Sequence, residues 1–138
     1  MNPQKETILA IDDDPVFLEL LAATFDKDYR VLQAKDGADG LRLAREELPH
    51  LILLDLMMPL ISGLEVVRGL QADMDTRAIP VILLTGCKMA KSTENMLRDN
   101  VNVVSFINKP CSFDTLTSQV RAALDHRITA ELDDKPST

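Results

Sequence analysis

The sequence has few cysteines, no long apolar run and no excess of basic residues, and each absence excludes a class of protein. Two cysteines, Cys87 and Cys111, are too few for a disulfide framework and lack the spacing of a metal signature. No apolar run approaches the roughly 20 residues of a membrane span, and residues 1–6 lack the apolar centre of a signal peptide. With 15 Lys and Arg against 22 Asp and Glu, the net charge of −7 argues against a nucleic-acid-binding face. We therefore expect a small, acidic, cytosolic protein that contacts neither membrane nor nucleic acid.

Five short apolar segments are present instead, and they alternate with longer amphipathic ones. Each is rich in Val, Ile or Leu and too short for a helix, which is typical of strands that are covered on both faces of a parallel sheet. These segments are residues 7–11, 30–34, 51–54, 81–84 and 101–107. A length of 138 residues fits one domain of about 150 residues. The alternation predicts an α/β fold with right-handed crossovers.

Residues that favour helix N-termini precede the stretches between these strands. They are Asp14, which is followed by Pro15; Asp36; Ser62, which can form a capping box with Glu65; and Ser112. Residues 89–99 contain few apolar side chains and predict the weakest helix. From Thr129 onward the sequence is polar without periodicity, so residues 129–138 are expected to be a disordered tail or the stump of a linker.

The first and last of the expected helices each have an apolar face at helical spacing. In the first helix the inward residues are expected to be Phe17, Leu20, Leu21, Thr24 and Phe25. In the last helix they are expected to be Phe113, Leu116, Val120, Ala123 and Leu124.

Polar residues with related chemistry follow four of the five strands. Asp12 and Asp13 follow the first, Asp55 ends the third, Thr85 the fourth, and Lys109 follows the fifth. Ligands of open α/β sheets bind beyond the carboxyl ends of the strands, so these side chains are expected to converge. Several carboxylates together suit Mg²⁺, and a carboxylate beside Mg²⁺ can attack phosphorus. A lysine and a threonine hydroxyl would stabilise the transferred phosphoryl group.

Four motifs in this order resemble the receiver domain of two-component response regulators. They are ILAIDDDP at residues 8–15, LILLDLMMP at 51–59, VILLTG at 81–86 and FINKP at 106–110. The resemblance covers about residues 5–128, so we expect a receiver domain over residues 1–128. It implies a flavodoxin-like, doubly wound sheet of five parallel strands in the order 2-1-3-4-5, flanked by five helices.

The resemblance implies a phosphoacceptor signalling domain, which is not an enzyme beyond catalysing its own phosphorylation and slow dephosphorylation. Asp55 would accept a phosphoryl group from a sensor histidine kinase or a phosphotransfer protein. Asp13 would ligate Mg²⁺ directly, Asp12 would help partly through water, and Asp55 and the backbone carbonyl of Met57 would complete the protein ligands. Lys109 would pair with a phosphoryl oxygen.

The resemblance also implies how phosphorylation changes the shape of the domain. Thr85 would move to hydrogen-bond the phosphoryl group and Phe106 would change its rotamer, which biases the region of the last two helices. The bond between Lys109 and Pro110 is expected to be cis. The implied recipients of the signal are a downstream effector, a fused output domain, or a second copy of the chain in a phosphorylation-dependent homodimer.

An aspartyl-nucleophile phosphatase of the haloacid dehalogenase type is the alternative function. Its signature, Asp-x-Asp-x-Thr, is matched by Asp12 and Asp14 but not by Val16. A flavodoxin-like electron carrier would need a phosphate-binding loop after the first strand, where this chain has three acids.

The sequence also departs from the receiver pattern, since Gly86 follows Thr85 where relatives usually have alanine.

Overall fold

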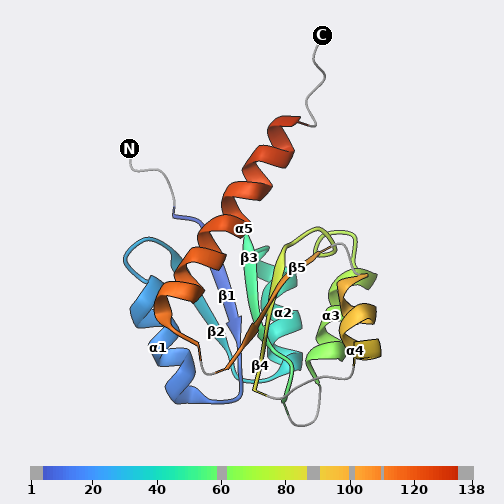
Figure 1. Ribbon diagram of the computed structural model, residues 1–138, viewed down its shortest axis with the longest axis horizontal. Coiled ribbons are helices and arrows are strands. Elements are labelled where there is room, and N and C mark those ends of the chain that lie inside the picture. The colour runs from blue at the N-terminus through green and yellow to red at the C-terminus, as the bar shows by residue number, and fades with distance from the viewer. Residues whose placement is uncertain (1–4, 59–61, 87–90, 100–101, 110, 134–138) are drawn as a thin grey trace.

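A five-stranded parallel sheet forms the centre of the protein, as the computed structural model in Figure 1 shows. The structure describes residues 5–58, 62–86, 91–99, 102–109 and 111–133. The strands are β1 (Thr7–Ile11), β2 (Arg30–Ala34), β3 (Leu51–Asp55), β4 (Val81–Thr85) and β5 (Val103–Asn108). The helices are α1 (Pro15–Phe25), α2 (Gly37–Glu47), α3 (Gly63–Ala72), α4 (Lys91–Arg98) and α5 (Phe113–Asp133). The predicted elements are therefore confirmed, with ends that shift by a few residues.

The strand order is β2-β1-β3-β4-β5, and each neighbouring pair is parallel. This order confirms the doubly wound topology that the resemblance implied. Because all five strands point the same way, their carboxyl ends meet at one edge of the sheet, from which α1 and α5 set out in Figure 1. That edge is where ligands bind in folds of this kind.

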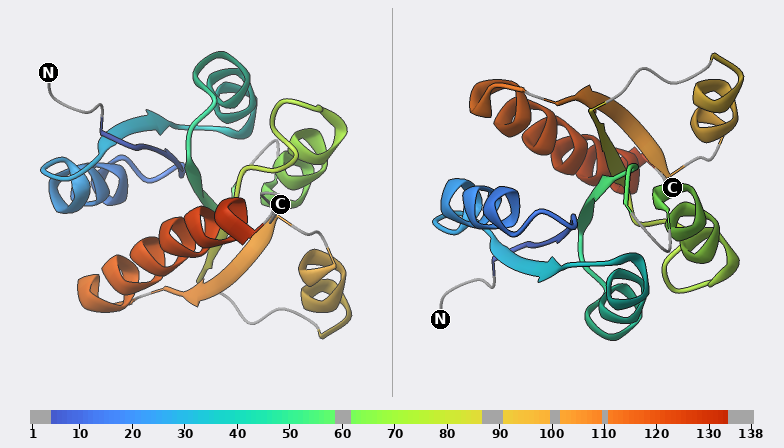
Figure 2. Two further views of the ribbon diagram at one scale, coloured as in Figure 1. Left: turned by 90° about the horizontal axis from the view of Figure 1, so that it is seen from above. Right: turned by 90° about the horizontal axis from the view of Figure 1, so that it is seen from below.

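The helices form two layers around the sheet. Seen along the sheet in Figure 2, α1 and α5 cover one face, whereas α2 and α3 cover the other and α4 lies with them beside β5. The buried side chains divide in the same way, because successive residues of a strand point to opposite faces. Leu53 belongs to the core under α1 and α5, and its neighbours Ile52 and Leu54 belong to the core under α2 and α3.

The predicted N-caps are confirmed. Asp14, Asp36 and Ser62 accept hydrogen bonds from the backbone N–H groups of Val16, Asp39 and Glu65, at 3.0, 2.8 and 3.4 Å. Ser112 accepts one from Thr115 N–H at 3.0 Å. Each cap starts a helix by satisfying backbone donors that have no partner within the helix.

Two predictions about the helix faces are wrong in part. The predicted inward set of α1 and α5 includes Leu20 and Phe113, which are 44% and 45% exposed, and Phe17, which is half-buried. Thr24 and Ala123 are also half-buried. The other predicted inward residues are buried as expected; they are Leu21, Phe25, Leu116, Val120 and Leu124. The apolar stripes of α1 and α5 are therefore wider than the area of sheet that they cover.

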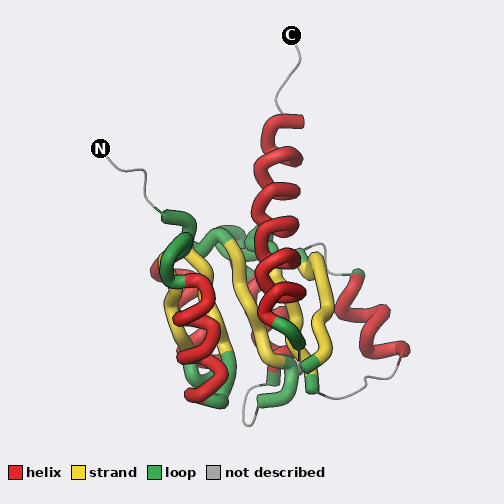
Figure 3. Tube along the Cα trace, turned by 60° about the vertical axis from the view of Figure 1, so that its left-hand side comes forward, coloured by secondary structure: helices red, strands yellow, loops and turns green. Residues whose placement is uncertain are grey.

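Helix α5 continues to Asp133, so the predicted disordered segment does not begin at Thr129. The residues between Ile128 and Asp133 lack glycine and proline and include alanine, glutamate and leucine, which favour a helix. Figures 1 and 3 show the last turns of α5 projecting beyond the sheet, away from the edge where α5 begins. None of the described helices has both the length and the apolar character needed to span a bilayer.

Candidate functional site

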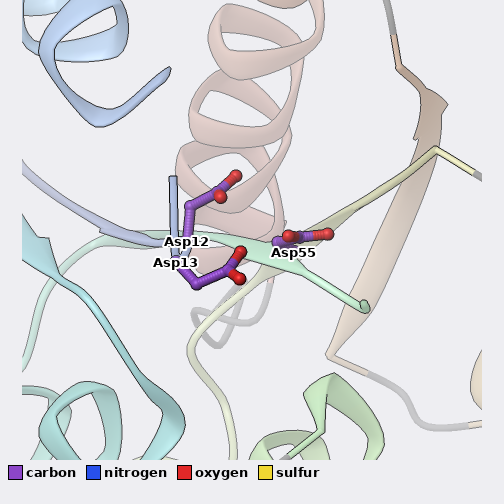
Figure 4. Close-up of side chains that lie close together, drawn as sticks. All are labelled: Asp12, Asp13 and Asp55. Carbon is purple, nitrogen blue, oxygen red and sulfur yellow. The ribbon is translucent and has the colours of Figure 1, made fainter. Parts of the chain in front are cut away.

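The carboxyl ends of β1 and β3 bring the three predicted aspartates together. Ile11 pairs with Leu54 in the parallel register, so Asp12 and Asp55 leave neighbouring strands at the same level. One carboxylate oxygen from each of Asp12, Asp13 and Asp55 lies within 4.8 Å of the other two, and Figure 4 shows the three side chains gathered at one place. Asp12 and Asp55 are buried, whereas Asp13 is exposed.

Lys109 places a positive charge beside this cluster. Its Nζ lies 2.6 Å from Oδ2 of Asp12 and 3.7 Å from Oδ2 of Asp55. The loop that carries it is tied to β4, because the backbone N–H of Lys109 donates to the carbonyl of Thr85 at 2.7 Å. Asp12 is held on its other side as well, since its Oδ1 accepts from the backbone N–H of Asp14 at 2.9 Å. The lysine thus lies within reach of both buried carboxylates.

The surroundings of Asp55 disfavour its ionised form. Burial raises the pKa of the Asp55 carboxyl, and the negative charges of Asp12 and Asp13 raise it further. A hydrogen bond from the backbone N–H of Met57 to Oδ1, at 3.1 Å, and the Lys109 ammonium both lower the pKa. The net result is a raised pKa, because burial removes the water that would solvate the carboxylate.

The residues fit a divalent cation. Among the described residues, Lys109 supplies the one ammonium near Asp12, Asp13 and Asp55, which leaves an excess of two negative charges when all three carboxylates are ionised. All three groups offer oxygen ligands, which Mg²⁺ prefers in proteins. Two of the three are buried, where solvent screens their repulsion less than at the surface. A divalent cation at this point would remove both the charge excess and the repulsion.

Thr85 lies on β4, the strand next to that of Asp55, and Phe106 lies on β5, one strand further from Asp55. Thr85 is the last residue of β4 and is buried. Phe106, on β5, is half-buried and packs against the core under α2 and α3. The guanidinium of Arg98, on α4, lies over the Phe106 ring at 4.5 Å from its centroid and is paired with Glu94 at 3.0 Å. The aromatic ring therefore contacts both the core and α4.

The other two predicted site residues are less well defined. Met57 lies two residues beyond Asp55 and is 59% exposed; its N–H contacts Asp55 as described, and its carbonyl as a metal ligand stays a prediction. Pro110, predicted to follow a cis peptide bond, lies outside the described residues.

The sequence did not identify one close neighbour of Lys109. The ring of Phe17, on the first turns of α1, has its centroid 4.2 Å from the Lys109 Nζ. Phe17 and Lys109 also line a groove of about 400 Å³, together with Asp14, Leu20, Cys111, Phe113 and Leu116. One signal for this contact was present in the sequence, because Phe17 lies five residues after Asp12 on the helix that starts at the site. The helical spacing of Phe17 with other apolar residues, however, indicated a core residue.

Comparison with known proteins places this site in a family. PilH of Pseudomonas aeruginosa is 35% identical over 118 residues, which are 85% of this chain and 96% of PilH. The polar-differentiation response regulator DivK of Brucella anthropi is 31% identical over 120 residues, 86% of this chain and 96% of DivK. A solved structure of the receiver domain of the sensor histidine kinase PA1611 from Pseudomonas aeruginosa, with magnesium coordinated in its active site cleft, has a TM-score of 0.77 at 25% identity and covers 88% of this chain and 98% of that chain.

In some relatives the matching segment is a smaller part of the protein. The chain spans 7% of the hybrid signal transduction histidine kinase D of Dictyostelium discoideum and 48% of the DNA-binding dual master transcriptional regulator RpaA of Synechocystis. The comparisons give no support to the alternative of a haloacid dehalogenase-type phosphatase. The family model described as the response regulator receiver domain matches residues 8–121. Its match, the strand order and the relatives agree, and the chain belongs to the response regulator receiver domain family.

Proposed function

We propose that the chain is a phosphorylation switch in which Asp55 accepts a phosphoryl group. The observation that carries this proposal is the position of the Asp55 carboxylate at the end of the central strand, beside Asp12, Asp13 and the Lys109 ammonium. A carboxylate can act as a nucleophile towards phosphorus. The ammonium lies where the charge of an added phosphoryl group would need to be neutralised.

The reaction forms one bond and breaks another. An oxygen of the ionised Asp55 carboxylate attacks the phosphorus of a phosphohistidine on the donor protein. The new O–P bond forms as the P–N bond breaks, and the imidazole leaves with the bonding electrons and takes up a proton. Later attack by water on phosphorus releases inorganic phosphate and restores the carboxylate. The chain would promote these two steps only on its own Asp55.

Asp12, Asp13 and Asp55, with the backbone carbonyl of Met57, would hold Mg²⁺. We assign a direct contact to Asp13 and a contact partly through water to Asp12, whose two oxygens already bind Lys109 and the Asp14 N–H. Bound Mg²⁺ supplies charge neutralisation at the phosphoryl oxygens. The acidic cluster supports this proposal, as does the magnesium described for the PA1611 receiver domain.

Phosphorylation would then change the contacts of Thr85 and Lys109. The Thr85 hydroxyl would donate to one phosphoryl oxygen, and Lys109 would pair with another. Phe106 lies on the neighbouring strand, paired with Leu83 in the register, and would change its rotamer as Thr85 moves. Because Arg98 of α4 rests on the Phe106 ring, the change would reach α4. A ligand shifts such an equilibrium only by its different contacts in the two states.

The partners follow from this chemistry. The donor would be a sensor histidine kinase or a phosphotransfer protein in the cytoplasm. The recipient would be a downstream effector, a fused output domain or a second copy of the chain. The hybrid kinase and the DNA-binding regulator among the relatives support a modular arrangement of this kind. We place the domain at residues 1–128, and α5 continues beyond it to Asp133.

The test is to incubate the protein with Mg²⁺ and acetyl phosphate and to measure its intact mass. We expect the mass of one added phosphoryl group, which is lost in Asp55→Asn and in a chelator. Asp75→Asn, which changes an exposed aspartate outside the site, should keep the adduct. An adduct that persists in Asp55→Asn, or none in the unchanged protein, would contradict the proposal.

A further inference from the structure

We propose that Phe17 is a positioning residue for Lys109. Its ring would hold the lysine ammonium at the mouth of the aspartate cluster, where the phosphoryl group of Asp55 would be received. This inference rests on the proposed function and adds to it a residue that neither the motifs nor the chemistry of phosphoryl transfer indicates. Phe17 would contact neither Asp55 nor the phosphoryl group, and would act through Lys109.

The geometry of the contact carries the inference. The Lys109 Nζ lies 4.2 Å from the Phe17 ring centroid, well within the roughly 6 Å over which a cation is attracted to the face of an aromatic ring. The Lys109 side chain is only 21% exposed, so water screens this attraction incompletely. Asp12 contacts the same ammonium at 2.6 Å. The lysine head is thus held between a carboxylate of the site and an aromatic ring on α1.

An aromatic ring suits this position because Lys109 must exchange partners. Lysine ends in a compact charge on a flexible four-carbon stem, so a single ion pair does not fix its place. In the structure it is 1.1 Å closer to Asp12 than to Asp55, at 2.6 and 3.7 Å. A third carboxylate in place of Phe17 would compete with the phosphoryl group for the ammonium. An aromatic face attracts the ammonium without offering a proton acceptor that must be given up when the phosphoryl group arrives.

The position of Phe17 on α1 explains why this ring is available. Phe17 is half-buried and packs against the core under α1 and α5, and this packing holds its ring in place. It lies at the groove that also contains Leu20 and Phe113. Leu20 is on the same helix one turn away, is 44% exposed, and has neither a charge nor an aromatic face that could attract the Lys109 ammonium. Leu20 therefore provides a matched control within the same groove.

The experiment compares the initial rates of phosphorylation by acetyl phosphate and Mg²⁺, measured by intact mass, for the unchanged protein, Phe17→Leu, Phe17→Trp and Leu20→Ala. Acetyl phosphate is small, so the rates do not depend on docking of a donor protein. We expect Phe17→Leu to be about two- to fivefold slower, the effect of losing a partly exposed cation–π contact. Phe17→Trp should regain the rate, because tryptophan binds cations best among the aromatic side chains. Leu20→Ala should leave the rate unchanged.

A second series distinguishes positioning from packing. Phenylalanine with one, two or three ring fluorines in place of Phe17 keeps the size of the side chain nearly constant but weakens the negative face of the ring. The rate should fall with each fluorine if the ring holds the ammonium, and a purely structural ring would leave the rate constant.

The two proposals fail in different ways. If the unchanged protein is phosphorylated on Asp55 while Phe17→Leu keeps the full rate and the fluorinated series is flat, the role of Phe17 is wrong and the proposed function stands. If the unchanged protein forms no adduct, or Asp55→Asn still forms one, the proposed function itself is wrong.

Discussion

Two consecutive strand–helix units on the same face of the sheet, β3–α3 and β4–α4, are anchored very differently. Helix α3 buries Val66, Val67 and Leu70 against the sheet, whereas Leu97 is the one buried residue among the described side chains of α4. The first unit carries Asp55 and the second carries Thr85. A well-packed element transmits strain and resists movement, and an element with few buried contacts opens at low free-energy cost. The comparison indicates that Asp55 is held in place and that, in the proposed switch, the response would pass through the second unit.

Two glycines, Gly63 at the start of α3 and Gly86 directly after β4, differ in the same way. A Cβ on Gly63 would lie 2.6 Å from the Cα of Leu56 and 2.9 Å from the carbonyl oxygen of Asp55, whereas a Cβ on Gly86 would meet no atom within 4 Å among the described residues. The start of α3 therefore lies directly against the backbone that carries Asp55. Glycine at position 63 is required by this close approach, whereas an added Cβ at Gly86 meets open space among the described residues.

The largest effect is expected from substituting these two glycines. Gly63→Ala should lower the free energy of unfolding by about 1–3 kcal/mol, because its methyl group must displace backbone atoms, and it should also slow the phosphorylation of Asp55. Gly86→Ala is the matched control, because Gly86 has no positive φ; its stability should be unchanged or rise by up to about 1 kcal/mol. Urea unfolding of both variants measures this. Equal losses in the two would contradict the difference between the two units.

A smaller effect is expected from removing the charge of Asp55, which the β3–α3 unit holds in place. Because folding raises the pKa of Asp55, the folded state binds the Asp55 proton more tightly than the unfolded state. Stability then falls as pH rises from the usual aspartate pKa through the raised value. Without Mg²⁺, Asp55→Asn should therefore be more stable than the unchanged protein at neutral pH. We expect a gain of about 1 kcal/mol, which is the size of the repulsion between two carboxylates about 4 Å apart in water.

The pH dependence of that difference is the measurement. Thermal unfolding of both proteins in a chelator should show a gain that shrinks as the pH falls through the raised pKa, where the unchanged protein binds the proton. Asp75→Asn, at an exposed position, should show no such gain. A gain in Asp55→Asn that stays constant from acid to neutral pH would contradict the burial effect.

The smallest effect concerns the contact between α4 and β5. Arg98 lies over the Phe106 ring, and a double-mutant cycle of Arg98→Ala with Phe106→Leu should give a coupling energy of about 0.5–1 kcal/mol. Lys91 supplies the matched control, because it is on the same helix and also pairs with Glu94, at 3.9 Å. The cycle of Lys91→Ala with Phe106→Leu should give no coupling in urea unfolding. Equal couplings would mean that Arg98 acts by general charge and not by its contact with the ring.

Much of the fold was predictable because its signals are local. The caps at Asp14 and Ser62 and the apolar runs of the strands depend on neighbours in the sequence, and the structure confirms them. The strand order came from the resemblance to a family, and periodicity alone does not give it. Helix α5 extends past Thr129 because helix propensity continues where apolar periodicity ends, and the prediction used only the polar composition and the loss of periodicity.

The candidate site, too, was predictable in part. The meeting of Asp12, Asp13 and Asp55 was predictable, since residues that end neighbouring parallel strands share an edge of the sheet. The contacts of Phe17 with Lys109 and of Arg98 with Phe106 were not, because they join residues from separate helices and strands. Their apolar or charged character in the sequence indicates only a core face or a solvated face.

The parallel α/β class, the helix starts and the acidic edge follow from the amino-acid sequence, because strand alternation and capping act over a few residues. The tertiary structure was needed to show that α1 and α5 have more apolar surface than the sheet can cover, which leaves Phe17 beside Lys109. It likewise decided that α3 lies against the backbone of Asp55 while α4 is held by Leu97 and a ring contact. Such contacts depend on how closely whole elements approach each other, and that distance is set by the packing of the complete molecule.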